Sequence, residues 1–215
     1  MAATAKTIPS QTTMPSHPGI EEIRQWMEEI DPEPEHGLQV TRLALGLFDS
    51  LAPLHGMGGR ERYLLEAAAL LHDVGMSVSD KRHHKNSYEL IKNHPFALWS
   101  PGEVAVIALV ARYHRKAAPS VKHPSFLALP EADREMVRRL AAILRLADGL
   151  DRAHLSTVKD LEVEYDPRTV RVKLYADRDC STEIWGGERK ARLFESVFSR
   201  RLSLEAVDGY RVRAV

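Results

Sequence analysis

The fold of this chain depends most on residues 64–75, which read Leu64-Leu65-Glu66-Ala67-Ala68-Ala69-Leu70-Leu71-His72-Asp73-Val74-Gly75. The first eight residues carry one charge and are otherwise Leu and Ala, which is typical of a helix buried on nearly every side. Gly75 suits the left-handed position that ends a helix, so we expect His72 and Asp73 in the last turn. Burying a polar group without a partner costs about 2–7 kcal/mol. These two side chains either bind a metal ion or simply close the helix and hydrogen-bond the local backbone.

Length and composition exclude several classes of protein. A chain of 215 residues can form one substantial domain with a small appended unit, and its single cysteine, Cys180, excludes an intramolecular disulfide. Thirty acidic and thirty basic residues give a formal net charge of zero, so we expect no DNA partner and no attraction to a membrane surface. No apolar run approaches the ~20 residues that span a bilayer, and the N-terminus lacks a signal-peptide pattern. We therefore expect a cytoplasmic protein.

Apolar residues at helical spacing predict a mainly α fold before residue 157. The predicted helices cover residues 19–30, 36 to about 54, 83–93, 101–112 and about 131–148. Ser100-Pro101-Gly102-Glu103 has the pattern of a capped helix start, and residues 117–130, with three prolines, are expected to form a loop. Residues 1–17 are expected to be a disordered tail, because they lack apolar periodicity. Residues 18–156 then form the helical domain.

From Val158 the apolar period changes from 3.6 to 2, which predicts a hairpin around Asp166-Pro167. A helix from about 187 to 199 follows, and residues 202–206 and 210–215 are expected to be short strands around an Asp208-Gly209 turn. Residues 157–215 therefore form a small α+β appendage of order β-β-α-β. Trp185, Phe194 and Phe198 can pack it onto the helical domain or onto a second copy of the chain, so a homodimer is one arrangement that the pattern allows.

Three predicted helices present imidazole or carboxylate groups at an end: His36, His72-Asp73 and Asp148. A mixed His/Asp set without cysteine suits a divalent ion of the Mn, Fe, Mg, Ni or Zn type, held with open coordination positions. His83 and His84 beside Lys85 can be a solvated surface patch instead. Arg145 and Arg152 lie three and four residues from Asp148 and can pair with either acid, and for Asp151 an ion pair with one of these arginines is the expected role.

Five stretches carry a resemblance to a known family. They are EHGLQVT at 35–41, ALLHDVG at 69–75, HHKNSY at 83–88, RYHRK at 112–116 and LRLADGLDR at 144–152. The order His, His-Asp, Asp on a helical body resembles the HD-domain superfamily of metal-dependent phosphohydrolases. Within it, these stretches are similar to the C-terminal HD region of the exopolyphosphatase/guanosine pentaphosphate phosphatase (Ppx/GppA) family, over roughly residues 19–200.

The resemblance implies an HD-type helical bundle and a set of site residues. His36, His72, Asp73 and Asp148 would bind a first ion, and His83 and His114 a second ion that Asp73 bridges. The cofactor would be one or two divalent ions per chain, of Mn, Mg, Fe, Ni, Co or Zn. Asp73, Arg115 and Lys116 are the expected catalytic residues. The substrate phosphate would contact Lys85, Arg115, Lys116 and Arg152, although each of these can be an ordinary surface charge.

Two functions follow from this resemblance. In the first, the protein is a phosphohydrolase in which a metal-bound hydroxide cleaves a phosphate ester or anhydride of a nucleotide or related molecule. In the second, it is a non-catalytic module that binds polyphosphate or a guanosine alarmone, or that pairs with a separate phosphatase half. These 215 residues lack the actin-like half that carries the exopolyphosphatase site, so that activity cannot simply be transferred. Asn86 also replaces a histidine common in similar sequences.

Overall fold

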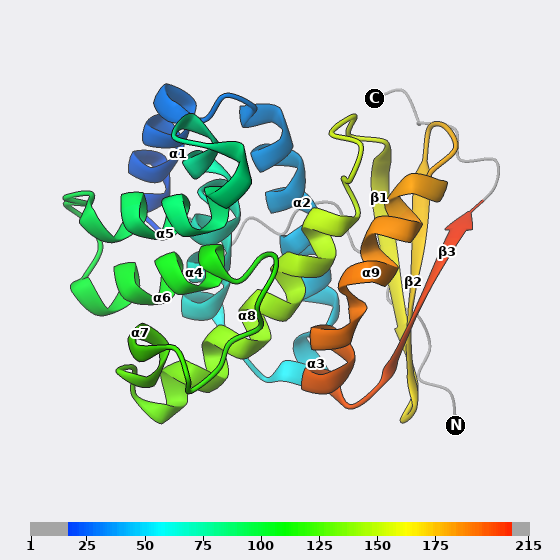
Figure 1. Ribbon diagram of the computed structural model, residues 1–215. Helices are drawn as coiled ribbons and strands as arrows, with labels where there is room; N and C mark the ends of the chain where they lie inside the picture. Colours follow the sequence, from blue (N-terminus) through cyan, green and yellow to red (C-terminus); the bar gives the residue numbers. More distant parts are fainter. Residues whose placement is uncertain (1–16, 208–215) are drawn as a thin grey trace.

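The computed structural model describes residues 17–207, in which a helical body is followed by a small three-stranded sheet (Figure 1). The elements are α1 (Gly19–Ile30), α2 (Pro34–Ser50), α3 (Ala52–His55), α4 (Gly59–Leu70), α5 (His83–Asn93), α6 (Pro101–Arg112), α7 (Pro124–Leu127), α8 (Glu131–Gly149), β1 (Val158–Tyr165), β2 (Thr169–Ala176), α9 (Ser181–Phe198) and β3 (Arg201–Val207). This confirms the expectation of a mainly α protein with β-β-α-β order near its C-terminus. The tail expected at 1–16 and the strand expected at 210–215 lie outside the described residues.

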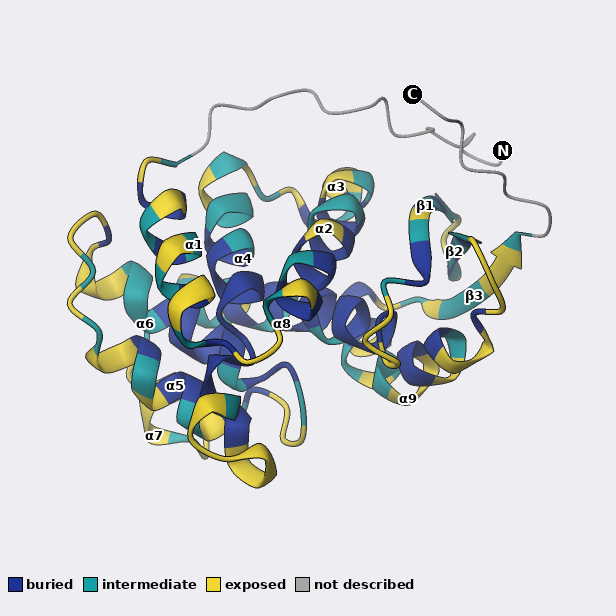
Figure 2. Cartoon of the chain, turned by 90° about the horizontal axis from the view of Figure 1, so that it is seen from above, coloured by how far each residue is buried: buried dark blue, intermediate teal, exposed yellow. Residues whose placement is uncertain are grey.

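Helix α4 is the centre of the helical body, and α1, α2, α6 and α8 all contact it. Its last six residues other than Glu66 are fully or almost fully buried, which Figure 2 shows as dark ribbon between the surrounding helices. Ala67, Ala68 and Ala69 have short side chains, so neighbouring helices can approach closely, while Leu64 and Leu65 fill the remaining space. The sequence prediction of a helix buried on nearly every side is confirmed.

The end of α4 differs from the sequence expectation. The helix ends at Leu70, so His72 and Asp73 lie just beyond its last turn and precede a 3-10 helix at Val74–Ser77. Gly75 does not adopt a left-handed conformation. It is needed for close packing instead, because an added Cβ would lie 2.3 Å from the backbone of both His83 and Ser87. This contact brings the segment after α4 against the start of α5.

Two other helix ends place residues of interest. Ser100 and Glu103 form the predicted capping box, so α6 begins at Pro101 and ends at Arg112, two residues before His114. Helix α8 begins at Glu131, as predicted, and carries Asp148 in its last turn. A short helix, α7, interrupts the expected loop at 117–130. No helix in the described part of the chain has the length and apolar character needed to cross a membrane.

The sheet has the order β1-β2-β3, with β1 and β2 antiparallel and β2 and β3 parallel. Helix α9 connects the parallel pair and lies between the sheet and α8 (Figure 1). At the other edge, Gln39 and Arg42 of α2 donate hydrogen bonds to the carbonyl of Val158, at 2.7 and 2.5 Å. The sheet is therefore attached to the helical body on both sides, through α9 and through α2.

The start of α9 is a second correction. The sequence predicts a helix from about residue 187, yet α9 begins at Ser181 and includes both Gly186 and Gly187. An added Cβ at Gly186 would lie 2.3 Å from the carbonyl oxygen of Gly149 on α8. The glycines thus permit close contact between two helices, an effect that local sequence does not reveal.

Candidate metal centre

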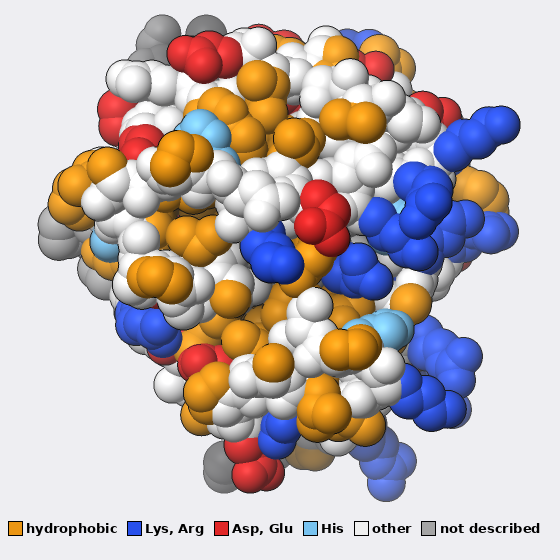
Figure 3. Space-filling view, turned by 60° about the vertical axis from the view of Figure 1, so that its left-hand side comes forward, with side chains coloured by type: hydrophobic (Ala, Val, Ile, Leu, Met, Phe, Trp, Pro, Cys, Tyr) orange, Lys and Arg blue, Asp and Glu red, His pale blue; other side chains and the backbone are white. Residues whose placement is uncertain are grey.

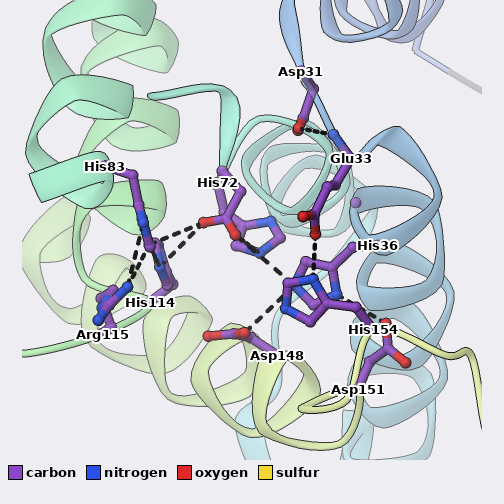
Figure 4. Close-up of polar contacts among 12 residues, drawn as sticks. Asp31, Glu33, His36, His72, His83, His114, Arg115, Asp148, Asp151 and His154 are labelled. Atoms are coloured by element: carbon purple, nitrogen blue, oxygen red, sulfur yellow. Dashed lines mark hydrogen bonds and ion pairs between the residues drawn. The ribbon is translucent and has the colours of Figure 1, made fainter. Parts of the chain in front are cut away.

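Six predicted metal ligands lie close together within the helical body, and Figure 4 labels all of them except Asp73. They come from five places in the fold: the first turn of α2, the segment after α4, the start of α5, the segment after α6 and the last turn of α8. All six are buried, with exposed fractions from 0 to 9 %: His36, His72, Asp73, His83, His114 and Asp148. Helices distant in sequence therefore deliver one polar cluster into an otherwise apolar interior.

The first group of donors contains His36, His72, Asp73 and Asp148. Asp73 Oδ2 lies 3.9 Å from His36 Nε2 and 3.7 Å from His72 Nε2. Asp148 Oδ1 lies 3.6 Å from His36 Nε2. Donor atoms that bind one ion at about 2.1 Å lie about 3–4 Å apart, so this spacing suits a shared cation.

The second group uses the other oxygen of Asp73. Its Oδ1 lies 3.3 Å from His83 Nε2 and 3.4 Å from His114 Nε2, and the two imidazole nitrogens are 3.2 Å apart. Asp73 therefore presents one carboxylate oxygen to each group, which is the arrangement that a bridging ligand requires.

Hydrogen bonds on the far side of the rings orient the histidines. His72 Nδ1 contacts the carbonyl of Ala69 and His114 Nδ1 that of Ala111, both at 2.7 Å. A carbonyl oxygen can only accept, so each Nδ1 must carry the proton and the neutral ring has a free lone pair on Nε2. His36 is held in the same way, with Nδ1 2.8 Å from Asp151 Oδ2. Histidine ligands of metal ions are typically oriented by such partners.

The residues fit a divalent cation. His36 Nε2, His72 Nε2 and Asp73 Oδ1 are buried and have no hydrogen-bond partner among the described residues. An unpartnered buried polar atom costs about 1–3 kcal/mol. His36 Nε2 and His72 Nε2 belong to the first group and Asp73 Oδ1 faces the second, so an ion in each group would supply the missing partners. The imidazole and carboxylate donors match ions of the Mn, Fe, Ni, Co or Zn type.

The surroundings set the charge of each donor. Burial would raise the pKa of Asp73, but the neighbouring histidines lower it to about 2. Burial would also raise the pKa of Asp148, which Lys190 and His36 hold well below its usual value. Burial lowers the pKa of His114 well below its usual value. For His36 burial acts in the same direction, but the neighbouring carboxylates of Asp148 and Asp151 raise its pKa to about 10, so an ion that binds Nε2 would have to displace a proton. Two ionised carboxylates and a neutral imidazole are thus available at neutral pH.

A cavity of about 500 Å³ opens beside the cluster, and Asp73, His83, His114 and Asp148 form part of its wall. Among the described residues, six Lys and Arg side chains line it, against three aspartates: Arg115, Lys116, Arg145, Arg152, Arg189 and Lys190, with Asp73, Asp80 and Asp148. Lys and Arg side chains also gather along one side of the face in Figure 3. A chain of zero net charge therefore places excess positive charge at this cavity.

The structure brings three of the four predicted phosphate-binding residues to the cavity: Arg115, Lys116 and Arg152. Lys85 is exposed and does not line the cavity, so its position does not match the predicted contact with a substrate phosphate. Arg115 Nη1 donates to His83 Nε2 at 2.8 Å, which places a guanidinium directly against the second group of donors.

Sequence reasoning missed several residues of the cavity. Arg145 donates to the carbonyls of Tyr113 and Lys116, at 2.9 and 3.2 Å, and so holds the segment that carries His114. Lys190 of α9 forms an ion pair with Asp148. Neither contact has a local signal, because each joins elements far apart in the chain.

Asp151 and His154 also belong to the site. Asp151 was expected to pair with arginine, but it bonds His36 Nδ1 at 2.8 Å and the backbone of Ser156 at 2.9 Å. The ring of His154 stacks on His36, with centroids 3.7 Å apart. Asp148, Asp151 and His154 are spaced by three residues, and this repeat of polar groups after an apolar helix could have indicated that all three serve one site.

Comparison with known proteins shows the family of this chain and a more distant relative. The family model described as Ppx/GppA phosphatase, domain III, matches residues 20–183. A guanosine-5'-triphosphate,3'-diphosphate pyrophosphatase of Pseudoalteromonas atlantica is 28 % identical over 130 residues. That alignment covers 60 % of this chain but only 25 % of the relative, so the chain spans about a quarter of the length of the relative that it matches.

Proposed function

This chain belongs to the Ppx/GppA phosphatase domain III family, and from that membership we propose that it is a metal-dependent phosphohydrolase. Its substrate is a phosphate ester or anhydride of a nucleotide or related phosphorylated molecule. We also assign the helical body to the HD-domain superfamily, on the order of its donors from His36 through His72-Asp73 to Asp148.

One observation carries the proposal. Three buried donor atoms without hydrogen-bond partners among the described residues, two in the first group and one in the second, lie beside a cavity that six cationic side chains and three carboxylates line. The donors suit a divalent ion, and the surplus of Lys and Arg favours an anionic ligand such as a phosphate. A purely structural cluster would have little need of both features.

His36, His72, Asp73 and Asp148 would hold a first ion, and Asp73, His83 and His114 a second. A bound divalent ion supplies positive charge that polarises a phosphoryl group and acidifies water. Asp73 is the residue on which both groups depend, because each of its oxygens faces one of them. Asp151 holds His36, and the carbonyls of Ala69 and Ala111 hold His72 and His114.

The cationic residues bind and orient the phosphate. Arg115 and Lys116 follow His114 directly, so their charges lie on the wall next to the second group. Arg152 and Lys190 line the same cavity, close to Asp148 in sequence and in space respectively. Neutralising the charge that develops on phosphoryl oxygens is most of what phosphoryl transfer demands, and no protein nucleophile is needed.

A second candidate is a non-catalytic module that binds polyphosphate or a guanosine alarmone, or that partners a separate phosphatase half. Two contacts favour it. Lys190 forms an ion pair with Asp148, and Arg115 bonds His83, so cations of the chain itself already contact both groups of donors. A site neutralised in this way can hold phosphate without hydrolysing it.

Turnover separates the two candidates. Nucleoside mono-, di- and triphosphates, guanosine tetraphosphate, cyclic nucleotides and short polyphosphate are assayed with Mn, Mg, Ni and Co. We expect hydrolysis that is lost in Asp73→Ala and retained in Asp160→Ala, which removes an exposed carboxylate that does not line the cavity. Binding without turnover, unchanged in Asp73→Ala, would instead establish the binding module.

A further inference from the structure

Helix α9 places a large aromatic side chain at the cavity. Trp185 lines the cavity together with Arg189 and Lys190, and 50 % of its surface is exposed. The buried aromatic residues of the same helix, Phe194 and Phe198, pack into the core instead. Trp185 therefore gains little from core packing, and an exposed apolar side chain at a binding cavity is typical of a ligand contact.

A neighbouring charge fixes the indole ring. The guanidinium of Arg189, one turn further along α9, lies 4.8 Å from the centroid of the Trp185 ring. This cation–π contact orients the indole on one side, while half of the side chain stays accessible. Indole rings and guanidinium planes are both groups on which nucleobases stack.

The aromatic and cationic walls are close enough for one ligand. Trp185, Gly186 and Lys190 lie on the same part of α9, and Lys190 contacts Asp148 of the candidate metal centre. A cavity of about 500 Å³ is within the range of small-molecule sites, roughly 300–1,000 Å³. A ligand with phosphates among the Lys and Arg side chains can therefore reach Trp185 with an attached planar group.

We propose that Trp185 is a base-stacking subsite, and that the natural ligand is a nucleoside phosphate rather than inorganic polyphosphate. The inference rests on the proposed function for the position of the phosphates. Inorganic polyphosphate has no apolar surface, so it gains nothing from an indole. A purine ring gains a stacking contact on Trp185, which sets the specificity of the site through the part of the substrate that does not react.

Isothermal titration tests this proposal with two ligands of similar charge, GTP and inorganic tripolyphosphate. The titrations are made once with EDTA, where metal-dependent hydrolysis stops, and once with Mg²⁺. We expect Trp185→Ala to weaken GTP binding about tenfold, in line with the loss of one base stack, and tripolyphosphate binding less than twofold. Trp185→Phe, which keeps an aromatic face, should retain most of the GTP affinity. Leu98→Ala removes an exposed apolar side chain that does not line the cavity, and should change neither affinity.

Equal weakening of both ligands in Trp185→Ala, or no effect on GTP, would overturn the subsite. The proposed function fails separately, through the absence of Asp73-dependent turnover. If tripolyphosphate hydrolysis depends on Asp73 but GTP binding does not depend on Trp185, the proposed phosphohydrolase function is retained and the nucleoside specificity is rejected.

Discussion

At the scale of single residues, the same hydrogen-bond arrangement orients two histidines of the candidate site. His72 and His114 each bond the carbonyl of an alanine three residues earlier, at the end of a buried helix. Ala69 and Ala111 are fully buried, and their short side chains leave room for a ring that folds back over the last turn. The spacing Ala-x-x-His after an apolar run therefore predicts an imidazole with its Nε2 lone pair directed away from the helix.

The first prediction concerns metal content. His72 Nε2 and Asp73 Oδ1 are buried polar atoms without hydrogen-bond partners among the described residues, and a bound ion would supply a partner for each. We therefore expect purified protein to hold one or two divalent transition-metal ions per chain. His72→Ala and Asp73→Ala should lower this content by more than half, as measured by elemental analysis after metal reconstitution and desalting. His55→Ala is the matched control, because His55 is equally buried but bonds Phe48 and Met57 outside the cluster. Negligible metal in all four proteins would contradict the site.

A second prediction uses His55 as a buried titrating group. Its Nε2 donates to the carbonyl of Phe48 and its Nδ1 accepts from the amide of Met57, so the neutral ring is fully bonded. Burial, together with the charge of Arg139, lowers the pKa of His55 below its usual 6.5. The unfolded chain thus binds a proton near pH 6.5 while the folded chain resists it, and stability falls as pH decreases below that value.

Urea unfolding at pH 7.5 and 5.5 measures this effect. The free energy of unfolding of the wild type should decrease more over this range than that of His55→Gln, which cannot titrate. Equal decreases in the two proteins would show that other groups account for the pH dependence.

At the scale of elements, the contact between α8 and α9 completes the cavity. Gly149 and Gly186 face each other, and an added Cβ at either position would approach the other's carbonyl oxygen within 2.7 Å. This close approach positions α9 so that Lys190 reaches Asp148 at the end of α8. Helix α9 of the appendage therefore forms one part of the cavity wall, and the helical body forms the rest.

A third prediction tests this helix contact. Gly186→Ala should destabilise the protein by about 1–3 kcal/mol, because its Cβ meets backbone atoms that can yield only if the helices separate. Gly102→Ala is the control, since Gly102 lies in the first turn of α6 with no atom within 4 Å of an added Cβ. It should be neutral or stabilising by up to about 1 kcal/mol. Urea unfolding compares the two, and equal stability of both variants would contradict the close contact.

The sequence predicted elements well where local chemistry decides them. The apolar run at 64–71, the capping box at Ser100 and the alternating hairpin after Val158 all lie where they were expected. Two of the errors in helix boundaries lie beside glycines that serve tertiary contacts: Gly75 packs against α5 and Gly186 against α8. Helical periodicity, together with the position of His and Asp residues at helix ends, also predicted His36, His72, Asp73 and Asp148 as metal ligands, and these residues lie in one cluster in the fold. Lys190 and Arg145 could not be selected, because their roles depend on contacts between distant elements.

At the scale of the whole molecule, the helical body and the appendage both contribute residues to the cavity. Trp185, Arg189 and Lys190 come from α9, whereas Arg115 and Lys116 follow α6. The proposed domains at 18–156 and 157–215 would therefore be two parts of one site. Substrate binding would then depend on how firmly they are attached.

The last prediction tests that dependence by ending the chain at Ser156. Leu146 of α8 and Leu150, which follows this helix, are fully buried and lie at Gly187 of α9, so truncation would expose them to solvent. Each buried Leu contributes about 1.5–3 kcal/mol, and we expect the truncated chain to aggregate or to unfold at a lower temperature. Size-exclusion chromatography with light scattering, followed by thermal unfolding, measures both properties.

The same light-scattering run gives the mass of the wild type. A mass of two chains would support the homodimer that the aromatic side chains of the appendage allow. The truncated protein should also lose GTP binding, because it lacks Trp185, Arg189 and Lys190. If residues 1–156 instead stay monodisperse, equally stable and equally able to bind GTP, the appendage is an independent module and α9 has no part in the site.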